Sequence, residues 1–247
     1  MNINPSTQIN LFGHKKIFND LLKLYKNDKL PNKILLSGEK GIGKSTLAYH
    51  LINFVLSQDE EQKYDYDNNI INSENKSFKL IQNKSNPNFN LIDVAEDKKN
   101  IDINQIRELI INLNKSSFNK KKRFVLIDNI ELLNINSINA LLKILEEPNK
   151  NIIFILIHNN KRVLSTLKSR CLNFKVFLTK DQSIRVINQI LNNDICNFIN
   201  DELIDNYITP GKLYKLIKFS EEYSLDFSSL NLNETLKTIF RDKIYKK

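Results

Sequence analysis

Eight consecutive residues carry the strongest chemical signal in the sequence. Residues 38–45 read GEKGIGKS and fit the P-loop pattern, between a short apolar run and a helical pattern. In such a loop backbone N–H groups surround phosphate oxygens, the lysine reaches the terminal phosphates and the hydroxyl residue binds magnesium. The sequence therefore predicts a site for ATP or ADP with magnesium, formed by Gly38, Gly41, Gly43, Lys44, Ser45 and Thr46.

A second candidate residue for nucleotide binding is Asp128, which follows the apolar run 124–127. A carboxylate at the end of a strand next to a P-loop is suited to hold the magnesium from the far side. An aspartate after a strand is also common as a simple turn or cap residue. We favour the magnesium interpretation, because two adjacent parallel strands would then end at one phosphate.

The residue after Asp128 lacks the chemistry that hydrolysis requires. A P-loop ATPase needs a carboxylate there to orient and polarise the attacking water, and this sequence has Asn129, whose amide cannot accept that proton. Glu131 is the alternative base, but its place in the chain predicts that it lies in the following turn. We expect nucleotide binding without hydrolysis, and an active ATPase with Glu131 as base is the alternative.

Composition sets limits on the class of protein. With 247 residues, 41% hydrophobic and 26% charged, the chain can form one main domain and a small second one. A net charge of +9 suits a nucleic-acid partner, although lysine and asparagine are spread along the whole chain, which is typical of a solvated basic surface. Cys171 and Cys196 are the two cysteines, and their spacing encodes no disulfide framework and no zinc site. Without an apolar segment of membrane-spanning length, we expect a cytoplasmic protein with no membrane partner.

Strand and helix patterns alternate around these residues. Apolar runs predict buried strands, and apolar residues at helical spacing separate them, which indicates an α/β fold with a parallel sheet and helices on both faces. The expected strands are 33–37, 124–128 and 152–157, with 78–81 and 89–94 as further candidates, and the expected helices include 45–56, 101–113 and 138–145.

The order of these patterns predicts the domain boundaries. We expect a nucleotide-binding domain over residues 1–178, a small helical lid over 179–222 and a short tail over 223–247. Beyond Phe177 we find only helical patterns, at 182–191, at 202–207 and from Pro210 onward. The polar segment 57–90 lacks sustained periodicity, and we expect it to be a surface excursion.

Several motifs together resemble bacterial clamp-loader subunits of the AAA+ class. Residues 139–148 read NALLKILEEP and are followed by Ser169-Arg170-Cys171, a combination that is specific to the delta-prime and gamma/tau subunits of DNA polymerase III. The stretches 11–14 (LFGH) and 30–32 (LPN) also match, and the resemblance covers roughly residues 8–220. The delta-prime type is favoured by Asn129, by the lack of a four-cysteine zinc module in 57–90 and by the short chain.

This resemblance implies a role in DNA replication. The chain would form a ring with gamma/tau and delta subunits, open the sliding clamp and load it on primer–template DNA. In that ring Arg170 would be an arginine finger, donated across an interface to the γ-phosphate bound by an adjacent gamma/tau subunit. An isolated surface arginine more often pairs with an acid, and the flanking Ser169 and Cys171 are what favour the finger.

Three positions depart from the pattern of the family. After Tyr223 the remaining chain is too short for a full helical collar, so we expect that collar to be truncated or absent. Where ATPase relatives carry a polar phosphate sensor, this chain has Ile157-His158-Asn159 with no serine or threonine, and His158 is either a sensor or a loop histidine. Lys212 stands where gamma/tau has a nucleotide-contacting arginine, and lysine lacks the forked geometry of arginine. A stand-alone P-loop kinase is a further alternative, but it does not explain the Ser-Arg-Cys triplet.

Overall fold

The computed structural model describes residues 3–95, 98–115, 119, 121–146, 151–160 and 165–241. The chain divides into two compact units, one of residues 2–39 and 44–176 and the other of residues 40–43 and 177–247, and each is described by itself. Glu147 and Pro148, where the sequence predicts the end of a helix, lie outside the described residues. Within the ranges just given, no helix is long and apolar enough to cross a membrane.

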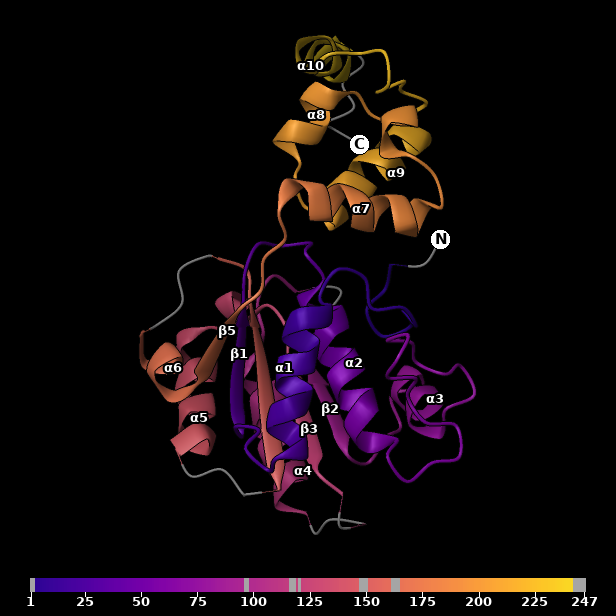
Figure 1. Cartoon of the computed structure of the whole chain (residues 1–247). Helices are drawn as coiled ribbons and strands as arrows, with labels where there is room; N and C mark the ends of the chain where they lie inside the picture. The colour runs from indigo at the N-terminus through magenta and orange to yellow at the C-terminus, as the bar shows by residue number, and fades with distance from the viewer. Residues whose placement is uncertain are drawn as a thin grey trace. The chain divides into compact units, whose positions relative to one another are not determined.

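A parallel sheet of five strands forms the centre of the larger unit (Figure 1). Its spatial order is β2-β3-β4-β1-β5 and its pairings are parallel, with Leu35 opposite Leu156 and Ile92 opposite Ile127. This arrangement confirms the predicted α/β class. The strands are β1 (Lys33–Ser37), β2 (Phe89–Ile92), β3 (Arg123–Ile127), β4 (Ile152–His158) and β5 (Leu172–Lys175).

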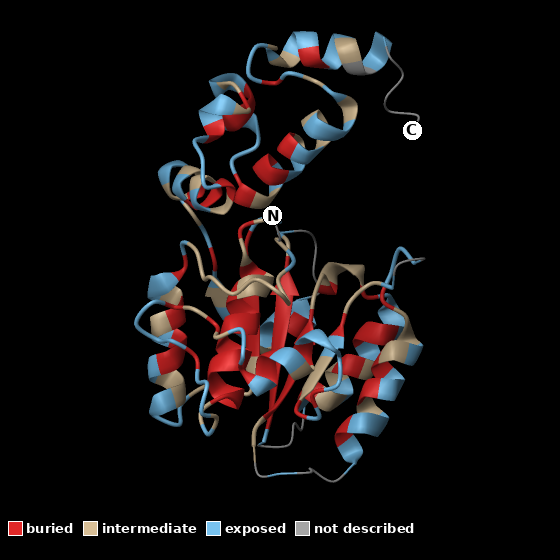
Figure 2. Cartoon of the chain, turned by 90° about the vertical axis from the view of Figure 1, so that its right-hand side faces the viewer, coloured by how far each residue is buried: buried red, intermediate tan, exposed pale blue. Residues whose placement is uncertain are grey.

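Helical layers cover both faces of the sheet, and its central strands β3 and β4 are buried along their whole length (Figures 1 and 2). One layer shares an apolar core with alternate sheet residues such as Leu35, Val125 and Phe154. It contains α4 (Ile103–Asn114), α5 (Ile135–Glu146) and α6 (Ser165–Arg170), whereas α1 (Lys15–Lys26) and α2 (Lys44–Leu56) pack together on the opposite face. Burial on both faces explains why β3 is apolar at every position after its first residue, Arg123, and why β4 is apolar at every position before its last residue, His158.

One predicted strand is a helix, and one strand of the sheet was not predicted. Residues 78–81 belong to α3 (Lys76–Gln82), which starts where the Asn75 side chain accepts a hydrogen bond from the Phe78 N–H at 2.8 Å. β5 was not predicted, because it is an edge strand whose Leu172, Asn173 and Lys175 are exposed and form no apolar run.

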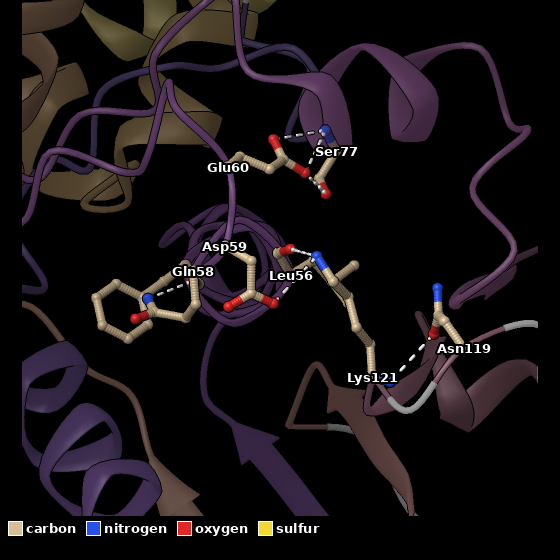
Figure 3. Close-up of polar contacts among 8 residues, drawn as sticks. Leu56, Gln58, Asp59, Glu60, Ser77, Asn119 and Lys121 are labelled. Carbon is tan, nitrogen blue, oxygen red and sulfur yellow. Dashed lines mark hydrogen bonds and ion pairs between the residues drawn. The ribbon is translucent and has the colours of Figure 1, made fainter.

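Buried polar contacts join segment 57–90 to α2, since Asn53 donates to Asn75 at 3.1 Å and His50 contacts the Tyr64 hydroxyl at 2.8 Å. The Glu60 carboxylate accepts hydrogen bonds from the backbone N–H and the hydroxyl of Ser77 (Figure 3). The Lys121 ammonium donates to the Leu56 carbonyl at 3.0 Å and pairs with Asp59 at 3.7 Å. A cavity of about 590 Å³ beside these residues lies at the C-terminal end of α2, whereas the P-loop lies at its N-terminal end.

The smaller unit is helical in its described part. It contains α7 (Lys180–Leu191), α8 (Asp201–Asn206), α9 (Pro210–Tyr223) and α10 (Leu232–Arg241). A capping box between Thr179 and Gln182 starts α7 two residues earlier than the apolar pattern indicates. α10 lies in the segment predicted to be a short tail, and the boundaries 1–178, 179–222 and 223–247 stay predictions.

His50, in the middle of α2, is completely buried. Its Nδ1 lies 2.8 Å from the Tyr64 hydroxyl, and its ring packs edge-on against Phe18. Burial disfavours the charged imidazolium and lowers the pKa of His50 from 6.5 to about 4.

We predict that this histidine makes the fold sensitive to mild acid. Between pH 6.5 and about 4 the unfolded chain binds a proton at His50 that the folded chain does not bind, so stability falls as the pH falls through this range. The loss should reach up to about 3 kcal/mol, from roughly 1.4 kcal/mol for each unit of pKa difference. Urea unfolding at several pH values measures it. The paired substitution His50→Phe with Tyr64→Phe removes both hydrogen-bonding groups, and an unchanged slope between pH 6.5 and 4 in that variant would refute the assignment.

Candidate nucleotide-binding site

The P-loop connects the end of β1 to the start of α2. Gly41 and Gly43 have φ angles of 88° and 92°, which side-chain-bearing residues rarely adopt, so the loop requires glycine at both positions. The Gly38 N–H donates to the carbonyl of His158 at 3.2 Å, which ties the start of the loop to β4. The loop residues therefore precede a helix N-terminus, where backbone N–H groups favour bound anions.

Lys44 is directed into this loop. Its side chain is 3% exposed, and its ammonium donates to the carbonyls of Gly38 at 3.0 Å and Glu39 at 2.5 Å. A buried ammonium needs such partners, because removing it from water is costly. A phosphate group bound in the loop would offer stronger acceptors in the same place, and the role predicted for Lys44 stays a prediction.

The hydroxyl of Ser45 donates to the carboxylate of Asp128 at 2.6 Å. Burial raises the pKa of Asp128 above its ordinary value and the charge of Asp93 raises it further, while the Ser45 hydrogen bond acts in the opposite direction. These are oxygen ligands of the kind that Mg²⁺ prefers, so Ser45 and Asp128 are suited to hold the magnesium of a bound nucleotide. Thr46, next to Ser45, is half-buried in the first turn of α2.

From the sequence, the strands that precede Ser45 and Asp128 were expected to be neighbours in the sheet. That expectation is wrong. β4 lies between β1 and β3, and the two side chains meet across its end. His158 is the last residue of β4 and is 3% exposed. It is thus a buried strand residue rather than a loop histidine.

Asn129 is held by hydrogen bonds on both sides of its amide. Its Nδ2 donates to Asp93 Oδ1 at 2.8 Å, and its Oδ1 accepts from Asn159 Nδ2, also at 2.8 Å. The backbone of Asn129 is left-handed, with φ of 54°, a conformation that asparagine tolerates better than most residues. The position where an ATPase needs a carboxylate therefore holds a fixed amide.

Glu131 is also engaged. It lies in the short 3₁₀ turn Ile130–Leu132, and its carboxylate accepts hydrogen bonds from the side chain of Asn159 at 2.9 Å and from its backbone N–H at 3.3 Å. Asp93 and Asn159, which complete this network, were missed in the sequence reasoning. Their signal is the position of each as a polar residue at the carboxyl end of a parallel strand, β2 and β4 respectively.

Residues 40–43 of the P-loop belong to the smaller unit and contact the start of α9 there. The Gly211 N–H donates to the Gly41 carbonyl at 2.8 Å, and the Thr209 hydroxyl donates to the Lys40 carbonyl at 3.0 Å. A Cβ atom on Gly211 would lie 2.7 Å from the Gly41 Cα, so this contact requires glycine. Lys212, the next residue of α9, is exposed, and its role at the nucleotide remains a proposal.

The hydrogen-bond partners of Arg170 lie outside the phosphate-binding loop. It is the last residue of α6, and its guanidinium donates to the carbonyl of Thr166 at 3.0 Å and to the carboxylate of Glu146 at 2.8 Å. One third of its side chain is exposed. The adjacent Cys171 packs against the apolar core, and burial raises the pKa of its thiol to about 11, which disfavours the reactive thiolate.

Comparison with known proteins places this geometry in a family. The family described as DNA polymerase III, delta subunit, matches residues 13–179, which include the P-loop, Asp128 and Arg170. The chain belongs to the DNA polymerase III delta-subunit family.

Individual relatives carry the names of several DNA polymerase III subunits. The chain is 33% identical over 138 residues to DNA polymerase III subunit delta' of Pseudomonas aeruginosa, a match that covers 56% of this chain and 40% of the relative. It is 27% identical to subunit gamma of Buchnera aphidicola subsp. Schizaphis graminum, over 94% of this chain and 62% of the relative. Subunit delta' of Buchnera aphidicola subsp. Baizongia pistaciae is also 27% identical, with coverages of 87% and 64%. The chain thus matches less than two thirds of the length of each of these relatives.

A solved structure supports the fold. The Thermotoga maritima RuvB Holliday junction branch migration motor superposes with a TM-score of 0.50 at 17% identity, covering 96% of this chain and 72% of that one. At this level of identity the likeness concerns the fold alone, and it agrees with the predicted α/β fold of this DNA polymerase III family member.

We predict that the Asp93–Asn129 contact requires one acid and one amide. Asn129→Asp keeps the size and backbone tolerance of the residue but places two carboxylates in contact, and should lower the free energy of unfolding by about 1–3 kcal/mol. The exchange variant Asp93→Asn with Asn129→Asp restores a donor and an acceptor and should recover most of that loss. Chemical denaturation of the three proteins measures both effects. An exchange variant no more stable than Asn129→Asp would contradict the assignment.

Proposed function

We propose that this chain is a delta-prime-type clamp-loader subunit of the DNA polymerase III holoenzyme that binds ATP or ADP with magnesium but does not hydrolyse it. It acts in cytoplasmic DNA replication in a complex with gamma/tau and delta subunits, and helps to load the sliding clamp on primed DNA. Catalysis is completed in trans, because Arg170 reaches the γ-phosphate in the site of a neighbouring gamma/tau subunit. Membership in the family supports the cellular role.

The observation that carries the proposal is the contrast between an intact phosphate site and an amide at the base position. Lys44 donates to a carbonyl of the loop and Ser45 donates to Asp128, and both contacts support a site for a Mg–nucleotide here. Asn129 accepts from Asn159 and donates to Asp93, so it offers no carboxylate to the attacking water. Such a site binds nucleotide and lacks the group that would activate water.

Arg170 supports the second half of the proposal. Its guanidinium is partly exposed at the end of α6, and its hydrogen-bond partners Thr166 and Glu146 are not residues of the P-loop. Arginine stays charged at any physiological pH and binds phosphate in a forked geometry, which suits the stabilisation of charge in phosphoryl transfer. The flanking Ser169 and Cys171 complete the motif from which the finger is inferred.

An active ATPase of the gamma/tau type is the second candidate, favoured by the proximity of Glu131 to this site. In that case the carboxylate of Glu131 would have to leave Asn159 and reach the attacking water. Purified chain that hydrolyses ATP, with activity lost in Lys44→Ala, would favour this candidate over the proposed one.

We predict that Lys44→Ala weakens binding of Mg–ATP by the isolated chain about tenfold or more, because the substitution removes the ammonium that faces the terminal phosphates. Lys40→Ala is the matched control, since Lys40 lies in the same loop but is exposed, and it should bind nearly as the parent does. Titration calorimetry measures both affinities. Equal affinities of Lys44→Ala and the parent would show that the loop does not bind nucleotide as proposed.

We predict that Arg170→Ala, in a loader rebuilt with the gamma/tau and delta subunits of the same organism, lowers turnover at the neighbouring ATP site by about 10³-fold or more. Arg170→Lys keeps the charge without the fork and should restore only part of the rate. Arg107→Ala, which removes an exposed arginine on α4, is the control for charge alone. Clamp- and DNA-stimulated ATP turnover is the measurement, and a normal rate in Arg170→Ala would exclude the finger.

A further inference from the structure

We propose that Glu146 is the positioning residue of the arginine finger. Its carboxylate accepts a hydrogen bond from Arg170 Nη2 at 2.8 Å, while Arg170 Nη1 donates to the carbonyl of Thr166 at 3.0 Å. Two separate contacts on the terminal nitrogens fix the direction and the plane of the guanidinium. This inference rests on the proposed function of Arg170 and adds a residue that determines how the finger is presented.

Both partners are anchored to the same strand of the sheet. Glu146 follows Leu145, which is fully buried and whose carbonyl accepts a hydrogen bond from the ammonium of Lys33 at the start of β1 at 3.0 Å. Arg170 precedes Cys171, which packs against the core, and Leu172, which pairs with Ile34 of β1. The contact between Glu146 and Arg170 thus joins the C-terminal ends of α5 and α6, and both ends are already held in place by packing against the core.

The ion pair is too exposed to be a major source of stability. The side chains of Arg170 and Glu146 are 33% and 54% exposed, and exposed pairs of this kind contribute little to the free energy of unfolding. The pair can still affect the orientation of Arg170, because a free arginine side chain loses rotamer entropy when it is fixed. If Glu146 and Thr166 restrict the side chain in advance, less entropy is lost when it meets the phosphate.

The geometry leaves the guanidinium able to bind a phosphate while it stays in contact with Glu146. Each terminal nitrogen of arginine carries two hydrogens, and the two contacts described use one hydrogen on each. The remaining N–H groups, including Nε–H, could donate hydrogen bonds to a phosphate bound in the neighbouring subunit. Glu146 therefore acts through Arg170 and does not touch the nucleotide itself.

The test is ATP turnover of the rebuilt loader with Glu146→Ala. We expect kcat at the affected site to fall about twofold to fivefold while KM for ATP stays the same, because the finger acts on the transition state rather than on substrate binding. Glu146→Gln keeps an oxygen acceptor for Nη2 and should restore most of the rate. Glu221→Ala is the matched control, as Glu221 is an equally exposed glutamate paired with Lys218, and it should leave kcat unchanged.

A double-mutant cycle separates this inference from the proposed function. In the Arg170→Ala background, Glu146→Ala should have no further effect, because there is no guanidinium left to position. If Arg170→Ala slows turnover but Glu146→Ala does not, or if Glu146→Ala raises kcat, the positioning role is refuted and the finger stands. If Arg170→Ala leaves turnover unchanged, the finger itself is refuted.

The isolated chain offers a readout that does not depend on assembly. NMR of the arginine side-chain N–H groups should show restricted motion of Arg170 in the parent and increased motion in Glu146→Ala, with Arg107 unchanged as an internal reference. Equal mobility of Arg170 in the two proteins would refute the positioning role even if turnover differed.

Discussion

The burial of a parallel sheet between two helical layers is the constraint on which the candidate site depends. Parallel strands place their carboxyl ends at one edge, and here that edge brings together the loop after β1 and the polar residues after β2, β3 and β4. The Ser45–Asp128 hydrogen bond is the direct product of this arrangement. It joins the first turn of α2 to the end of β3, with β4 lying between β1 and β3.

The residues at this edge suit nucleotide binding but lack a carboxylate at the position where hydrolysis needs one. Lys44 and Ser45 retain the chemistry of phosphate and magnesium binding, whereas Asn129 replaces the carboxylate and is fixed by Asp93 and Asn159. Arg170 lies elsewhere on the larger unit, just before the edge strand β5, and its guanidinium donates hydrogen bonds to Thr166 and Glu146. A subunit built in this way is suited to contribute an arginine to another active site, which is the role we propose within the DNA polymerase III family.

Much of this structure was predictable from the sequence where a local pattern determines it. The P-loop and the buried strands β3 and β4 were found because glycine spacing and continuous apolar runs have a direct structural meaning. Strand β5 was not found, and the alternative that Arg170 pairs with a surface acid did not identify Glu146 as that acid. An edge strand needs no apolar run, and residues 24 positions apart in the sequence meet only through tertiary packing. The network of Asp93, Asn129 and Asn159 depends on strand order, which the sequence reasoning did not determine.

The most direct test of the central claim is a high-resolution structure of the assembled loader with a non-hydrolysable ATP analogue in the neighbouring gamma/tau subunit. We predict that the guanidinium of Arg170 lies within hydrogen-bond distance, about 3 Å, of the γ-phosphate in that site. A structure in which the guanidinium faces solvent, with another group contacting that phosphate, would refute the role proposed for Arg170.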